Sequence, residues 1–188
     1  MSATLKEGQV LIRNARLSFP KLFRAEAVKG DPDARPRYGC ALLVPKDDEA
    51  TMAKINKEIQ RLAKEKMKGV QPKRKDISIK DGDAEDGDDF SKGCWIISAN
   101  RQESQGRPVV IDRDRSPLAE SDGKPYAGCY VNAVVSLYVP RNWPTKVCAS
   151  LEVVQFAKDG EPFGAGRVDP DVMPDLTDEE DGEEGFVL

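Results

Sequence analysis

The sequence predicts a mainly β protein with a single amphipathic helix. Short runs rich in β-branched and aromatic residues recur along the chain, and Gly, Pro and Asn bound them. Helical periodicity, in contrast, dominates one segment alone. We expect these elements to share one domain, residues 1–167, because the chain is long enough for a single core plus some unstructured sequence.

Seven segments have the composition of strands. In chain order they are 9–19, a weaker candidate at 22–28, then 37–45, 94–101, 108–112, 128–139 and 146–158. Alternation is clearest in 129–139, where every second residue from Cys129 to Val139 is apolar. The opposite face of that strand carries two tyrosines with Asn and Ser, so we expect it to face solvent.

Residues 47–68 are expected to form the helix. Acidic residues open the segment, lysines close it and Gly69 follows, which matches helix start and stop signals. Its apolar residues Met52, Ile55, Ile59 and Leu62 recur every three or four positions, so one face should pack on the strands. The stretches 71–93 and 113–127 are expected to be loops.

A small antiparallel barrel of the OB type combines five strands and a helix, and its open face and loops take oligonucleotides. The sequence has six or seven candidate strands, so one or two would form accessory hairpins. Residues 168–188 are acidic, punctuated by Gly and Pro and poor in apolar residues, so we expect a disordered tail.

Charge is divided unevenly along the chain. The 29 basic and 33 acidic residues give a net charge of −4, but the segment from Asp169 onward holds nine acids and no base. Residues 1–168 therefore carry 29 basic and 24 acidic residues, a net charge of about +5. Such asymmetry is typical of proteins that bind nucleic acid, and a mildly basic domain with a solubilising tail is the alternative.

Several classes of chemistry are disfavoured. The chain has no histidine, which argues against Ser-His and Cys-His nucleophiles and most zinc enzymes. It also lacks the glycine-rich loops that hold nucleotides, so we expect no cofactor and no enzymatic activity. The four cysteines are scattered beside apolar runs and are expected to be buried free thiols. No signal peptide or apolar run of about 20 residues is evident, so a cytoplasmic location is expected.

The acidic stretch 81–89 has the composition of a metal-binding loop. An EF-hand loop starting at Asp81 would place Asp86 where glycine is needed and Lys92 where glutamate is needed, so calcium is not supported. A nuclease that holds metal with these carboxylates stays a minor alternative. A solvated loop is favoured, and no metal is expected.

Aromatic and basic side chains are interleaved near the strongest strand. Tyr126 precedes it, Tyr130 and Tyr138 share its polar face, and Trp143 follows in a turn with Arg141 and Lys146. Nucleotide bases stack on aromatic rings without regard to sequence, whereas tyrosines can also simply cover a sheet face. The candidate nucleic-acid-binding residues are Arg16, Phe19, Lys21, Tyr38, Trp95, Arg101, Arg107, Tyr126, Tyr130, Tyr138, Arg141, Trp143 and Lys146. The run Lys73 to Lys75 is either a phosphate clamp or solvated charge, and solvated charge is the default.

Ordered motifs across the body resemble a known family. They are "RLSFPKLF", "CALLVPK", "IKDGD", "PVVIDRDRSPL", "DGKPYAGCYVNA", "GCYVNAVVSLYV" and "VCASLEVVQFAKDGEPFGAG", between about Arg13 and Gly166. Together they resemble phage-encoded single-stranded DNA-binding proteins. The resemblance implies an OB barrel that coats single strands during phage replication and recombination, in the cytoplasm of an infected bacterium.

The acidic tail fits that expectation. Phage single-strand binders often end in an acidic tail with an aromatic residue near the terminus, here Phe186 followed by two further residues. We expect the tail to compete with DNA for the basic body and to recruit replication or recombination proteins. The residues expected to do so are Asp178, Glu179, Glu180, Asp181, Glu183, Glu184 and Phe186. A β-barrel adaptor with a DNA-mimicking tail is the main alternative function.

Overall fold

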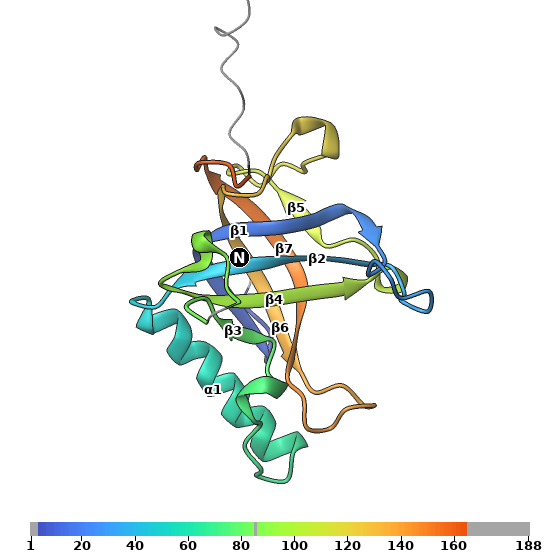
Figure 1. Cartoon of the computed structure of the whole chain (residues 1–188), viewed down its shortest axis with the longest axis vertical. Helices are drawn as coiled ribbons and strands as arrows, with labels where there is room; N and C mark the ends of the chain where they lie inside the picture. Colours follow the sequence, from blue (N-terminus) through green and yellow to red (C-terminus); the bar gives the residue numbers. More distant parts are fainter. Residues whose placement is uncertain (1–3, 85, 165–188) are drawn as a thin grey trace, which may run out of the picture.

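The computed structural model describes residues 4–84 and 86–164 of the 188-residue chain. Five strands close a barrel, in which neighbours follow the order β1, β2, β4, β7, β6 and back to β1 (Figure 1). The strands are β1 (Gln9–Glu26), β2 (Arg37–Pro45), β4 (Cys94–Gln102), β6 (Tyr130–Tyr138) and β7 (Cys148–Lys158). All these pairings are antiparallel except the parallel pairing of β4 with β7. The prediction of a mainly β, OB-type barrel is confirmed.

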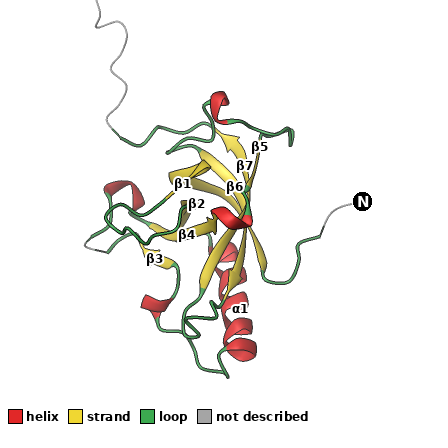
Figure 2. Cartoon of the chain, turned by 90° about the vertical axis from the view of Figure 1, so that its right-hand side faces the viewer, coloured by secondary structure: helices red, strands yellow, loops and turns green. Residues whose placement is uncertain are grey.

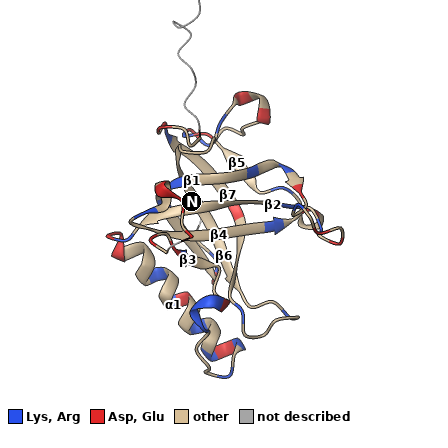
Figure 3. Ribbon diagram, in the orientation of Figure 1, with Lys and Arg blue, Asp and Glu red and all other residues tan. Residues whose placement is uncertain are grey.

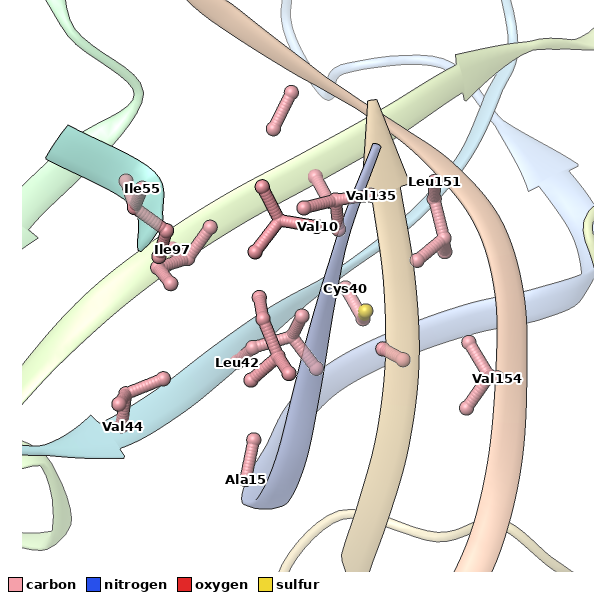
Figure 4. Close-up of a cluster of buried hydrophobic side chains, with 14 of the residues drawn as sticks. Val10, Ala15, Cys40, Leu42, Val44, Ile55, Ile97, Val135, Leu151 and Val154 are labelled. Carbon is pink, nitrogen blue, oxygen red and sulfur yellow. The ribbon is translucent and has the colours of Figure 1, made fainter. Parts of the chain in front are cut away.

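The core fills the barrel with one row of side chains from every strand. Figure 4 shows Val10, Leu42, Ile97, Val135 and Leu151, one from each of the five strands, pointing into the same interior. The alternation predicted for β6 is confirmed, because its buried and half-buried residues alternate along the strand. Burial of such aliphatic side chains contributes about 25 cal/mol per Å² of apolar surface and is the main stabilising term of the fold.

Strand β1 is long enough to pair with both β6 and β2. Its pairing with β6 shifts register between Ile12 and Ala15, and its pairing with β2 shifts after Ser18. Asn14 and Phe19, at these two irregularities, have φ of 51° and 47°, in the left-handed region. Such bulges bend a strand and let it turn a barrel corner. The two predicted segments 9–19 and 22–28 are therefore one continuous strand, and their separation was wrong.

Helix α1 (Glu49–Lys66) covers one end of the barrel, as Figure 2 shows. The Asp48 side chain caps its first turn by accepting a hydrogen bond from the Thr51 backbone N–H at 3.1 Å. Ile55, Ile59 and Leu62 are buried against the strands, as predicted. The helix lies between β2 and β4 in the chain, and the predicted range 47–68 includes its two capping residues.

Two short strands lie outside the barrel. β3 (Ile79–Asp81) extends the sheet beyond β4, and β5 (Val109–Ile111) pairs with β7. The prediction that 71–93 is an irregular loop was wrong, since it also holds the 3₁₀ turns Arg74–Asp76 and Asp89–Ser91. Its many polar residues conceal a strand of three residues, too short for alternation to show.

All four cysteines are free thiols, but only two are buried. Cys40 and Cys129 lie in the core, and burial raises the pKa of Cys40 to about 12. Cys94 and Cys148 are half-buried, so the prediction of four buried thiols was wrong for them. Within the described residues, no helix is long and apolar enough to span a membrane.

Candidate nucleic-acid interface

An aromatic and basic cleft lies where β6 passes into β7. We name this cleft, of about 760 Å³, the Tyr138 cleft. Tyr138 and Trp143 in it are exposed large side chains, at 44% and 56%. Its basic lining residues are Arg37, Arg101, Arg141 and Lys146, and no acidic residue among those described lines it. The cleft is therefore positively charged and carries two accessible rings.

The turn 139–147 holds Trp143 on the rim of the cleft. The Trp143 backbone N–H donates to the Pro140 carbonyl at 3.1 Å, and the Lys146 N–H donates to the Trp143 carbonyl at 3.1 Å. Lys146 Nζ lies 5.0 Å from the centre of the Trp143 ring, a cation–π distance. The two backbone hydrogen bonds fix the turn, so the ring is presented to solvent by a defined segment.

Tyr138 supplies a neutral ring to the same cleft. Partial burial raises the pKa of its phenol, the neighbouring Cys148 raises this pKa further, and Arg37 lowers it. The phenol is therefore uncharged at neutral pH and does not repel a phosphate.

Arg101 shapes the wall of the cleft. Its guanidinium donates to Glu152 at 2.7 Å and to the carbonyls of Gly106 and Gln105 at 2.9 and 3.0 Å. These contacts use donors on all three of its nitrogen atoms, so Arg101 has less capacity for phosphate than the sequence suggested. Arg141 and Lys146, in contrast, make no ion pair among the described residues.

A second cleft lies on the other side of Trp143. Its volume is about 620 Å³, and it lies between the end of α1, the segment 67–76 and the β6–β7 turn. We name it the lysine cleft, because its charged lining residues are Lys66, Lys68, Lys73, Lys75 and a single acid, Asp76. In Figure 3 the blue 3₁₀ turn Arg74–Asp76 lies beside α1.

A third depression, the central groove, lies over the outer faces of β2 and β4. Small residues such as Ala41 and Ser98 form its floor, and Phe19, 64% exposed, lies on its rim. Three basic and three acidic side chains line it, so their charges cancel: Arg74, Lys75, Lys80, Asp81, Asp86 and Asp88. Lys75 lines both this groove and the lysine cleft, and Trp143 lines both the lysine cleft and the Tyr138 cleft. The three depressions are thus adjacent in that order.

Arg16 and Tyr130 belong to a different cluster. The two lie side by side in the β1–β6 pairing, and Lys158 Nζ lies 4.6 Å from the Tyr130 ring centre. Arg16 lies 4.3 Å from the ring of Phe163, which stacks on Phe90 at 4.2 Å. Tyr130 and Tyr138 do share the predicted face of β6, but eight residues separate them, roughly 26 Å along a strand. They cannot be neighbours in one stacking platform.

The other predicted residues lie outside the three depressions. Trp95 lies beside α1, with Lys46 and Arg74 at 5.0 and 4.5 Å from its ring centre. The Tyr126 hydroxyl donates to Asp159 at 2.7 Å. The remaining three are Lys21, which pairs with Glu26 at 3.0 Å, Arg107, which lies over Phe23 at 5.6 Å, and Tyr38, half-buried opposite Arg101 in the β2–β4 pairing.

Sequence reasoning missed part of the lining. Arg37 and Asn100 in the Tyr138 cleft and Lys66 and Lys68 in the lysine cleft come from distant segments. The spacing of the lysines along α1 indicates only that they lie on its solvent-exposed face. No local signal in the sequence distinguishes the lysines that line a cleft from those that do not. The run Lys73 to Lys75 is visible in the sequence as a phosphate clamp or solvated charge, and the default interpretation is solvated charge.

The acidic loop, which begins at Asp81 at the end of β3, is fixed by ion pairs with Lys46. Lys46 Nζ forms ion pairs with Asp81 at 2.6 Å and with Asp83, and the pKa of each carboxyl is lowered first by its hydrogen bond to Lys46. In the part of the chain that the structure describes, no three His, Cys, Asp or Glu side chains form a group able to hold a metal ion.

A closed five-stranded barrel with a basic, aromatic cleft at the turn between its last two strands defines a nucleic-acid-binding class of protein. The chain belongs to the family of single-stranded DNA-binding proteins described for Enterobacter phage Enc34, whose model matches residues 8–186. The predicted family resemblance is confirmed.

Individual relatives agree with this assignment. "Putative protein p50" of Acyrthosiphon pisum secondary endosymbiont phage 1 is 34% identical over 171 residues, which cover 85% of this chain and 89% of that protein. The solved structure of the bacteriophage Enc34 single-stranded DNA-binding protein in complex with ssDNA has a TM-score of 0.71 at 28% identity, covering 87% of this chain and 97% of that one. Another structure of the Enc34 protein has a TM-score of 0.66 at 30% identity, covering 89% and 94%.

The predicted tail contacts lie outside the described residues. These predicted contact residues are the six acids between Asp178 and Glu184 and the aromatic Phe186. The expected domain boundary at 167–168 also lies outside the described residues.

Proposed function

We propose that this chain binds single-stranded DNA with little sequence preference, and that bases stack on Trp143 and Tyr138 in the Tyr138 cleft. Family membership supports the ligand class. The observation that carries the choice of site is the exposed Trp143 ring, held over a cleft with four basic and no acidic described lining residues. Each base–aromatic stack contributes roughly 1–3 kcal/mol and tolerates any base.

Arg141 and Lys146 would bind backbone phosphates beside the stacked bases. Their charges are unpaired within the described chain, and such contacts carry no sequence information. The rings of Tyr130 and Phe19, with Arg16, are candidates for further contacts with a longer strand. In this account Trp95, Tyr126, Tyr38 and Arg107 have structural roles.

The role of the chain is to coat single strands during phage replication and recombination, in the cytoplasm of an infected bacterium. It acts by binding alone, without catalysis and without a cofactor. Residues 168–188 compete with DNA through their acids and recruit replication or recombination proteins through Phe186. The nine acids from Asp169 onward and the net charge of about +5 in residues 1–168 support this competition.

A gel-shift assay in EDTA tests the binding proposal. Oligo(dT) should be shifted at lower protein concentration than a duplex of equal length, because only unpaired bases can stack on Trp143 and Tyr138. Equal affinity for duplex would contradict the site, and absence of any shift would favour the protein-interaction alternative. Degradation of the probe after Mg²⁺ is restored would instead indicate a nuclease.

A further inference from the structure

The lysine cleft combines uncompensated positive charge with one face of an aromatic wall. Four lysines and a single acid, Asp76, are the charged residues that line it. Lys66, Lys68, Lys73 and Lys75 form no ion pair with any described residue. Four lysines against one acid give the cleft a positive potential, so the cleft attracts anions.

The segment 73–76, which carries Lys73 and Lys75, is fixed to the barrel by Arg74. The Arg74 guanidinium carbon lies 4.5 Å from the Trp95 ring centre, and its Nη2 lies 3.7 Å from Asp81. Two backbone hydrogen bonds join the same segment to the start of β7: Val147 N–H donates to Asp76 at 2.8 Å and Ser78 N–H donates to Val147 at 2.9 Å. The lysine run is therefore a positioned element beside the β6–β7 turn.

Trp143 separates the lysine cleft from the Tyr138 cleft and lines both. We propose that the two clefts are consecutive subsites of one path, and that the lysine cleft binds the backbone phosphates of nucleotides beyond those stacked in the Tyr138 cleft. This inference rests on the proposed function. The ligand at the new subsite is the phosphodiester backbone of a single strand.

The residue types fit that role. Lysine is a compact, strongly hydrated charge on a flexible stem, and it contacts phosphate without the fixed bidentate geometry of arginine. A subsite made of lysines therefore accepts variable backbone conformations and any sequence. The wall supplied by Trp143 would orient the strand as it leaves the stacked bases.

The test compares two double variants with the same change of charge. In Lys66→Gln/Lys73→Gln, both substitutions lie in the lysine cleft only. The control is Lys57→Gln/Lys64→Gln, on the exposed face of α1 and in none of the three depressions. Binding of oligo(dT) of about 16 nucleotides, the upper site size of one OB fold, is measured by fluorescence anisotropy at several salt concentrations.

The cleft variant should lose about 1.4 from the slope of log K against log salt, because each phosphate contact on a single strand contributes about 0.7. Its deficit relative to wild type should therefore shrink about sevenfold when salt rises fourfold. The control should keep the wild-type slope.

Equal slopes for wild type and the cleft variant would overturn the lysine subsite while leaving single-strand binding intact. Failure of the wild-type chain to bind oligo(dT) would overturn the proposed function itself, and the subsite with it. If the double variant unfolds, Lys73→Gln alone should reduce the slope by about 0.7, and an unchanged slope in that variant would overturn the subsite.

Discussion

Trp143 and Trp95 show how strongly surroundings decide the role of identical side chains. Both lie near basic residues in the sequence. Trp95 faces α1 and has Lys46 and Arg74 over its ring. Because Lys46 pairs with the acidic loop and Arg74 lies between Lys73 and Lys75, Trp95 helps to fix both of these segments. Trp143 is 56% exposed on a turn and separates two basic clefts. Of the two rings, that of Trp143 is the more exposed and offers the larger surface to a base.

Basic residues divide in the same way. Arg101 donates to Glu152 and to two carbonyl groups, so its charge is compensated inside the protein. Arg141 has no ion pair among the described residues and lines the same cleft. The arginine guanidinium has five N–H donors, and these favour hydrogen bonds within the protein. An arginine near a cleft is therefore not by itself a phosphate contact.

Among the structural elements, β1 and the loop after β3 differ most from the structure that the hydrophobic pattern of the sequence predicts. The bulges at Asn14 and Phe19 bend β1 so that one strand serves two neighbours. A φ of 47° is costly for phenylalanine, and such strain is typical of sites with a function. The bend leaves the Phe19 ring exposed on the rim of the central groove.

The acidic loop predicts how stability depends on pH. The pKa values of Asp81 and Asp83 are lowered, first by Lys46 and then by backbone N–H groups. A carboxyl with a folded pKa below its ordinary value of 3.8 stabilises the fold above that pH, and this contribution is lost as pH falls through the folded pKa. The melting temperature should therefore stay level with respect to these two groups down to about pH 4 and fall below it.

Asp83→Asn isolates this contribution. Asp83 accepts from both Lys46 and the Gly93 N–H, so the variant should melt lower at pH 7 and lose less stability on acidification. Asp47→Asn is the matched control, because Asp47 is exposed and makes no ion pair among the described residues. Thermal unfolding followed by circular dichroism at pH 7 and pH 3 measures both. The same pH dependence in Asp83→Asn as in wild type would contradict the account.

At the scale of the whole molecule, charge is separated between residues 1–168 and the segment that follows. A polyanion attached to a basic domain competes with DNA phosphates for the same lysines and arginines. Removing residues 169–188 should therefore tighten single-strand binding, most strongly at low salt, where electrostatic competition is least screened. Titration of truncated and full-length chains with oligo(dT) at two salt concentrations measures this.

A variant with Asp178, Glu179, Glu180 and Asp181 changed to their amides keeps the length of the chain and should behave partly like the truncation. Unchanged or weaker binding in both variants would show that the acids do not compete with DNA.

The sequence predicted the barrel well because alternation in strands such as β6 reports burial directly. It predicted part of the candidate site, since Tyr138, Arg141, Trp143 and Lys146 are close together along the chain. It failed where the site depends on contacts between distant segments. Trp95 is turned towards α1 by the β2–β4 pairing. Lys66 lines the same cleft as Trp143 only because α1 ends beside the β6–β7 turn.

The most direct test uses single-tryptophan variants. Trp95→Phe leaves Trp143 as the only tryptophan, and Trp143→Phe leaves Trp95. Stacking of a base on the indole quenches its fluorescence, so saturating oligo(dT) should quench the Trp95→Phe protein strongly and the Trp143→Phe protein little. Bases that stack on Trp95 instead would give the reverse. If Trp143 emission stays unchanged while oligo(dT) is bound, the strand does not cross the cleft wall and the account of this interface is wrong.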